Sequence, residues 1–257
     1  MRSANEHRPR PTLLVFTLGA EAECRRRRLL PVRHTRVEAA FHRACLESAL
    51  AAGRAAGCRL AVATNAGQEL PADAIAITQH GSSFGERFKH AVADAETLAD
   101  GPLLIVGTDV PDLRTRHLRL AIARLETTPE RVVVGPSPDG GFYLLAATAS
   151  LAGLLDGVHW CRRDTSRTLA STLEAAGRPI ERLEPLHDLD HTADLEQWLA
   201  RGPRPLKLLL PALAALRRLL AACKRPLVPR HIGRARLVGA GDLGGRAPPP
   251  KRRIRAA

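Results

Sequence analysis

The chain has 257 residues, of which 45% are hydrophobic, so it is long enough to bury the core of one sizeable domain. Its formal net charge of +13 would suit a protein that binds nucleic acid along its length, but the charge is unevenly distributed. Residues 202–257 carry 14 of the 39 Lys and Arg and only one of the 26 Asp and Glu, which leaves residues 1–201 neutral. Specific nucleic acid binding is therefore not expected.

The cysteines give no sign of a disulfide framework or a zinc site, because all five are widely spaced and none forms a C-x-x-C pair. The N-terminal stretch MRSANEHRPRP is polar and lacks the apolar segment of a signal peptide. We therefore expect a cytoplasmic protein with reduced thiols.

Apolar runs and helical patterns alternate through the first half of the chain. Short aliphatic and β-branched runs predict strands, and apolar residues that recur every three or four positions predict helices. Gly57 is expected to end the first helix, and Thr115 to cap a later one. In chain order, the predicted elements are a strand over 12–18, a helix within 35–57, strands over 58–64 and 74–78, a helix over 85–98, a strand over 102–107 and a helix over 116–125.

The second half continues this alternation, with only PDGG and its neighbours between its first two strands. Asp190 or Thr192 is expected to cap the closing helix. Strands that alternate with helices in this way predict an α/β fold with a mostly parallel sheet covered on both faces. The predicted elements are strands over 131–137 and 141–148, a helix over 165–176, a strand over 180–186, a loop over 187–194 and a helix over 193–200.

The composition changes after residue 201, so we predict a domain over residues 12–201 and a basic appendage over 202–257. RPLKLLLPALAALRRLLAAC is Leu-rich but contains Pro211 and basic residues, which argues against a membrane-spanning helix. It either packs on the domain or lies on an anionic membrane surface. The remaining sequence is rich in Pro, Gly and Arg, and we expect it to be disordered.

The stretch LLIVGTDVPDL changes from a buried strand to polar residues within four positions. In an open parallel sheet, ligands bind beyond the carboxyl ends of the strands. Asp109 lies at such an end, where a carboxylate suits Mg²⁺ or Mn²⁺ held against a diphosphate. Asp112 is interpreted instead as part of a turn or a helix cap beside Pro111.

Two further stretches carry candidate site residues. GPSPDGGFYLL surrounds Asp139 with prolines and glycines, and its Gly140 and Gly141 either let a ligand approach the main chain or supply positive φ in a hairpin turn. HDLDHTADL places Asp188 and Asp190 two positions apart, hence on one face if the segment is extended. For Asp190 alone, a helix-capping role is the stronger interpretation.

Together, in this order and spacing, these stretches resemble the DUF2064 family. These bacterial proteins are related to guanylyl- and molybdopterin-nucleotidyltransferases and are classed as glycosyltransferases. The family motifs G-S-D-x-P-x-L, G-P-x-x-D-G-G-Y-Y-L and D-x-D-T-P-x-D-L correspond to GTDVPDL, GPSPDGGFYLL and DLDHTADL here. GSSFGERF is similar to G-x-x-x-L-G-E-R, and Trp160 stands before a predicted helix as in the family. The resemblance covers roughly residues 12–200.

This resemblance implies the nucleotide-diphospho-sugar transferase (GT-A) fold, a three-layer α/β/α sandwich that binds a nucleotide at the end of its first strands. Asp109 would bind Mg²⁺ or Mn²⁺, with Asp188 or Asp190 as a second acidic ligand. Gly107 and Thr108 would lie beside the nucleotide phosphates.

The resemblance also implies which residues lie on the sugar or acceptor side of the site. Asp139, Gly140 and Gly141 would line that side. Asp139 and His187 are the candidates for a general base, on the basis of position alone.

One segment departs from the family pattern. FTLGAEAECRRRRLLP aligns without gaps over the Pro/Gly-rich loop and K-T-R-L, so that Arg26 replaces the lysine and Arg27 the threonine, whereas Arg28 and Leu29 match. The prolines and the loop glycine are absent, which leaves a less preorganised phosphate site. We predict that Arg26 and Arg28 hold a diphosphate by forked hydrogen bonds. Arg27, like Arg25, fits a solvated basic turn equally well.

The leading hypothesis is a metal-dependent glycosyltransferase that uses a nucleotide-sugar and an acceptor of unknown identity. A nucleotidyltransferase that uses a nucleoside triphosphate is the alternative within the same enzyme class. A hypothesis from another class is a catalytically silent nucleotide-binding domain. The missing glycine of the first loop argues for it, and the retained Asp109 and PDGG argue against it.

Overall fold

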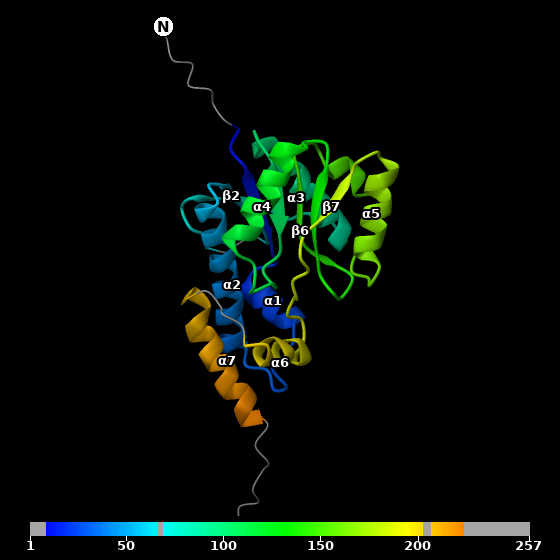
Figure 1. Cartoon of the computed structure of the whole chain (residues 1–257). Coiled ribbons are helices and arrows are strands. Elements are labelled where there is room, and N and C mark those ends of the chain that lie inside the picture. Colours follow the sequence, from blue (N-terminus) through cyan, green and yellow to red (C-terminus); the bar gives the residue numbers. More distant parts are fainter. Residues whose placement is uncertain (1–8, 66–68, 203–206, 224–257) are drawn as a thin grey trace, which may run out of the picture. The chain divides into compact units, whose positions relative to one another are not determined.

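A computed structural model describes residues 9–65, 69–202 and 207–223 (Figure 1). Its core is a seven-stranded sheet with the order β3-β2-β1-β4-β6-β5-β7 among the described residues. The neighbouring strands run parallel except for β6, which is antiparallel to both β4 and β5. The strands are β1 (Thr12–Phe16), β2 (Arg59–Thr64), β3 (Ala74–Thr78), β4 (Leu103–Val106), β5 (Val132–Pro136), β6 (Phe142–Ala147) and β7 (Ile180–Arg182).

Helices cover both faces of this sheet. The apolar sides of α2 and α4 join one core cluster with β1, β2 and β4, and those of α3 and α5 join a second cluster on the other face. The predicted three-layer α/β/α fold with a mostly parallel sheet is confirmed. The α-helices are α1 (Ala20–Arg26), α2 (Thr35–Ala55), α3 (Phe84–Leu98), α4 (Thr115–Thr127), α5 (Thr165–Ala175), α6 (Thr192–Ala200) and α7 (Leu210–Cys223), with short 3-10 helices η1 (Ala152–Leu154) and η2 (Lys207–Leu209).

Helix α1 was not predicted, because its arginines suggested a loop. Acidic Glu21 and Glu23 lie in its first turn and basic Arg25 and Arg26 in its last turn, which suits the helix dipole at both ends. The helix packs on α2 through a small cluster of Ala20, Cys24 and Ala39. The chain after β1 is therefore a short, anchored helix rather than an open loop.

The caps of two helices differ from the prediction. Arg114, rather than Thr115, precedes α4, and its backbone N–H donates to a ring nitrogen of His117 at 2.9 Å. His191, rather than Asp190 or Thr192, precedes α6, and its backbone N–H donates to the carboxylate of Asp194 at 2.8 Å. In both helices, a side chain of the first turn reaches back to the cap, which leaves Asp190 available for other partners.

Helix α7 belongs to the same compact unit as the sheet. Its buried leucines share a core cluster with Leu29 and Leu30 after α1, with Phe41 of α2 and with Trp198 of α6. The predicted boundary at residue 201 divides this cluster, because the leucines that follow the boundary pack against residues that precede it. The predicted Pro/Gly/Arg-rich tail lies outside the described residues, and with it any contact between that tail and a membrane. None of the helices in the described part of the chain has the length and apolar character that a membrane crossing requires.

Truncation after Gly202 is expected to destabilise the domain strongly. It removes leucines of α7 that are almost fully buried, and each such side chain contributes roughly 1.5–3 kcal/mol. Urea unfolding of this truncation, compared with a truncation after Cys223, measures the difference. Equal unfolding midpoints would show that α7 adds nothing to the core.

Candidate active site

The site forms at the carboxyl end of β4, in the center of the sheet. Gly107 follows the strand, and a Cβ atom there would lie 2.6 Å from Oδ1 of Asp109, so the glycine makes room for that carboxylate. Thr108 is buried and donates through Oγ1 to Oγ1 of Thr17 at 3.2 Å, which ties the end of β4 to the end of β1. These contacts fix Asp109 at the edge of a buried strand.

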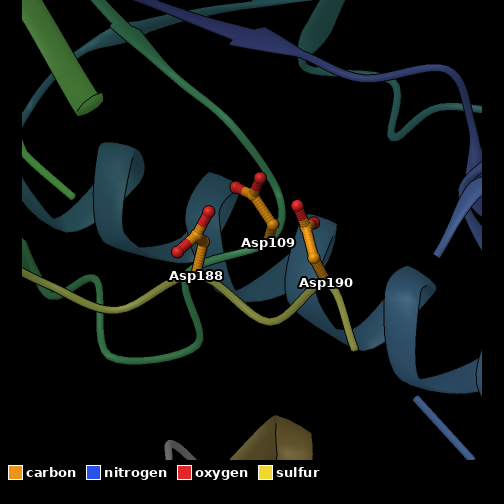
Figure 2. A group of neighbouring side chains, drawn as sticks. All are labelled: Asp109, Asp188 and Asp190. Carbon is orange, nitrogen blue, oxygen red and sulfur yellow. The ribbon is translucent and has the colours of Figure 1, made fainter. Parts of the chain in front are cut away.

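The segment before α6 brings two more carboxylates to this edge. The backbone N–H of Leu189 donates to the carbonyl oxygen of Asp109 at 2.9 Å, and the Leu189 side chain is buried. Asp188 and Asp190 flank this anchor, and Figure 2 shows their carboxylates directed toward that of Asp109. One carboxylate oxygen from each of the three residues lies within 4.8 Å of the others. We call Asp109, Asp188 and Asp190 the acidic group.

Arg27 inserts a positive charge into the acidic group. Its guanidinium donates to Oδ2 of Asp109 at 2.8 Å and pairs with Asp190 through its other terminal nitrogen. Its Nε donates to Oε2 of Glu23 at 3.0 Å, one turn away on α1. Burial alone would lower the pKa of Arg27, but the carboxylates of Asp109 and Glu23 outweigh burial and raise the pKa above its usual value. Arg27 is thus a buried, permanently charged partner of three carboxylates.

Asp188 is the member of the acidic group that Arg27 does not balance. Among the described residues, no Lys or Arg forms an ion pair with it. Burial, together with the negative charges of Asp139 and Asp109, raises the pKa of Asp188 to about 6. The cluster therefore holds more negative charge than Arg27 neutralises, which favours a further cation.

A cavity of about 550 Å³ opens beside the acidic group. Among the residues predicted from the sequence, those that line it are Arg26, Gly107, Thr108, Asp109, Asp139, Gly141, Asp188 and Asp190. This volume lies within the range of pockets that bind small molecules and cofactors. Four stretches far apart in the sequence thus contribute to one concave site.

Three predicted residues lie away from the cavity lining. Arg28 is exposed and donates to the carbonyl oxygen of Pro31 at 3.2 Å, while its backbone pairs with His191. His187 does not line the cavity either, which leaves Asp139 as the base candidate that faces it. At Gly140, φ is 98°, and a Cβ atom would overlap the carbonyl oxygen of Arg163. The absence of a side chain at Gly140 therefore allows two backbone segments to approach each other closely.

Asp139 and Asp112 have different surroundings. Asp139 is exposed, and its Oδ1 accepts the backbone N–H of Gly141 at 2.9 Å, which orients the carboxylate at the cavity. Asp112 accepts the indole N–H of Trp198 at 2.7 Å and thereby links the turn before α4 to α6. Asp112 was interpreted as a helix cap, but in the structure its carboxylate makes this tertiary contact, and Arg114 precedes α4.

Sequence reasoning missed Arg27 as a site residue and missed the aromatic side chains of the cavity. The signal that could have identified Arg27 was its alignment with the threonine of K-T-R-L. At that position a long charged side chain replaces a short one. Phe16, Phe84, Phe142 and Trp160 line the cavity, but they are far apart in the sequence, so that only the tertiary structure shows their clustering.

Comparison with known families gives a match over residues 37–162 to the family described as "Uncharacterized protein conserved in bacteria (DUF2064)". The predicted DUF2064 resemblance is confirmed. The matched segment contains Asp109 and the PDGG turn, whereas Arg27, Asp188 and Asp190 lie outside it. No curated protein matches the sequence.

Solved structures share the architecture of this chain. A provisionally assigned nucleotide-diphospho-sugar transferase from Desulfovibrio desulfuricans G20 superposes with a TM-score of 0.69 at 22% identity, over 81% of this chain and 97% of the other. A 4-diphosphocytidyl-2C-methyl-D-erythritol synthase from Anaerococcus prevotii DSM 20548 gives 0.50 at 8% identity, over 82% and 99%. Identities this low establish the nucleotide-diphospho-sugar transferase fold alone.

Proposed function

We propose that this protein is a transferase that acts on a nucleotide-linked donor in the cavity at the carboxyl ends of β1 and β4. The observation that carries the proposal is the acidic group, which lies where this class of sheet binds ligands. Glycosyl transfer from a nucleotide-sugar is the leading reaction, and nucleotidyl transfer from a nucleoside triphosphate is the alternative.

The donor set suits a hard divalent cation such as Mg²⁺ or Mn²⁺. Asp109, Asp188 and Asp190 present only carboxylate oxygens, which these ions prefer, and Arg27 leaves part of their charge unbalanced. When bound, the ion would supply positive charge to the phosphates of the donor. Arg27 shares Asp109 and Asp190 with this position, so its guanidinium contributes a second, permanent positive charge beside the same phosphates.

Two other residues of the cavity have roles in this proposal. Arg26 lines the cavity, and its guanidinium lies 6.0 Å from the center of the Phe84 ring, so it is placed to contact a phosphate at the cavity mouth. Asp139 is the proposed general base, because its carboxylate faces the cavity and is oriented by Gly141. Arg28 has no part in this proposal, since it does not line the cavity.

The silent nucleotide-binding domain remains the second candidate because Arg27 already neutralises part of the acidic group. A thermal-shift screen of nucleotides and nucleotide-sugars, with and without Mg²⁺ or Mn²⁺, tests the proposal. We expect a stabilisation that needs both donor and ion. Product formation from that donor separates the enzyme from the silent domain, and the absence of any donor-dependent shift would contradict both.

Arg26→Ala is expected to weaken donor binding by at least about 1 kcal/mol, the usual loss for a charge-assisted contact. Arg28→Ala is the matched control: it removes the same charge two residues away, outside the cavity lining. Calorimetric titration of the donor identified in the screen compares the two variants. An equal effect in both would assign the change to general electrostatics rather than to contact with the donor.

A further inference from the structure

The lining of the cavity is unusually aromatic. The chain has eight Phe, Tyr and Trp residues, and six of them line this one cavity. Phe88 and Tyr143 are buried, whereas the other four are only partly buried and present surface to the cavity. We call these four residues, Phe16, Phe84, Phe142 and Trp160, the aromatic wall.

Trp160 is held in a fixed place within this wall. Its ring center lies 5.5 Å from that of Phe84 and 4.9 Å from that of Phe88. A Cβ atom at Gly85 would overlap the indole ring, so the glycine allows Trp160 to sit directly on the start of α3. A rigid, partly exposed indole is suited to stacking against a ring of a ligand.

The loop that carries Trp160 also carries cations and is itself constrained. Cys161 has φ of 57°, a left-handed conformation that is rare for residues other than glycine. Oγ1 of Thr165 donates to the carbonyl oxygen of His159 at 2.7 Å and accepts the backbone N–H of Arg162 at 3.1 Å. The surrounding structure therefore imposes the conformation that directs this loop toward the cavity.

Two arginines of this loop, Arg162 and Arg163, line the cavity beside the aromatic wall. Arg162 pairs with Asp164 at 3.2 Å, but Arg163 is exposed and forms no ion pair within the described part of the chain. A guanidinium without a counter-charge next to stacking rings favours a ligand that is both anionic and ring-bearing.

We propose that the aromatic wall together with Arg163 forms the acceptor subsite, and that the acceptor is a phosphate or carboxylate compound with an aromatic or apolar ring. This inference rests on the proposed function, which assigns the donor phosphates to Arg26 and the acidic group. The PDGG turn connects the two subsites, because Gly140 packs against the carbonyl oxygen of Arg163 and Asp139 precedes it. The ring of the acceptor stacks on Trp160, its anionic group pairs with Arg163, and its hydroxyl lies near Asp139.

Tryptophan fluorescence provides a direct test with phenyl phosphate as the probe. Trp198 is 1% exposed, so acrylamide quenching reports mainly on Trp160. Phenyl phosphate is expected to protect the fluorescence from quenching in a saturable way, and inorganic phosphate is not. Arg163→Gln, a change at an exposed position, is expected to raise the dissociation constant for phenyl phosphate about tenfold, as for the loss of one charge-assisted contact. Trp160→Phe is expected to remove the protected signal.

Calorimetric titration of a nucleoside diphosphate with Mn²⁺ into the same proteins separates the two proposals. Unchanged nucleotide binding in Arg163→Gln supports a separate acceptor subsite. If the nucleotide itself protects Trp160 from quenching and binds more weakly to Arg163→Gln, the aromatic wall is a nucleobase site and the inference is overturned. The inference is also overturned if phenyl phosphate gives no protection. Protection by phenyl phosphate in a protein that binds no nucleotide would instead contradict the proposed function and leave the anionic ring subsite standing.

Discussion

Asp109→Asn is expected to abolish metal-dependent donor binding while the domain stays folded. Asparagine keeps the volume of the side chain and an oxygen that accepts from Arg27, so the contact now 2.8 Å long can persist. The amide removes the negative charge that a divalent cation requires, at the member of the acidic group closest to the end of β4. We expect a loss of at least about 1.4 kcal/mol, a tenfold fall in affinity, measured by calorimetric titration of donor with Mn²⁺.

Asp112→Asn is the matched control for this variant. It makes the same chemical change three residues later, where the carboxylate accepts the indole N–H of Trp198 and an amide oxygen can replace it. Cooperative unfolding with a retained midpoint would show that both variants are folded. Equal loss of donor binding in the two, or metal-dependent binding retained in Asp109→Asn, would show that the proposed metal ligand is misplaced.

Arg27→Thr, which introduces the residue of the aligned K-T-R-L motif, is expected to cause the largest loss of stability among the single substitutions. The buried guanidinium is the shared partner of Glu23, Asp109 and Asp190, and its removal leaves their charges uncompensated. Removing one partner of a buried ion pair typically costs about 3–5 kcal/mol. Urea unfolding measures the effect, with Arg26→Thr as the control at an exposed neighbouring position, where we expect a change within about 0.5 kcal/mol.

Divalent cations should partly reverse the effect of Arg27→Thr. With the guanidinium gone, Mg²⁺ or Mn²⁺ can replace its charge at the acidic group, so the ion should raise the unfolding midpoint of the variant more than that of the wild type. An equal response to the ion in both proteins would contradict the idea that the ion can replace the charge of Arg27 at the acidic group. A loss of stability no greater than that of Arg26→Thr would contradict the structural role of Arg27.

The order of strands and helices was predictable because each element has a local signal. The aliphatic run before Gly107 and the helical spacing from Val37 to Ala49 both agree with the observed elements. Helix α1 was missed because seven residues give too weak a periodic signal, and its arginines resembled a basic turn. The core role of α7 was left open because a Leu-rich amphipathic pattern suits a protein core and a membrane surface equally well.

The candidate site was predictable only where its residues follow strands or form a compact motif. The sequence places Asp188 and Asp190 on one face of a segment, and Asp109 at a strand end, but their meeting depends on tertiary structure. Arg27 joins residues 82 and 163 positions away in the chain, so no local pattern shows that its charge is buried. Gly140 illustrates the same limit, since its close neighbour is the backbone of Arg163 rather than a ligand.

Anomalous diffraction at the manganese edge, from crystals grown with Mn²⁺ and a nucleoside diphosphate, tests the central claim most directly. We predict an anomalous peak in contact with the carboxylates of Asp109 and Asp188, with the phosphates of the nucleotide beside it and Arg26 nearby. An ordered nucleotide elsewhere on the protein, or a nucleotide in this cavity with no manganese at the acidic group, would contradict the proposed metal-dependent donor site.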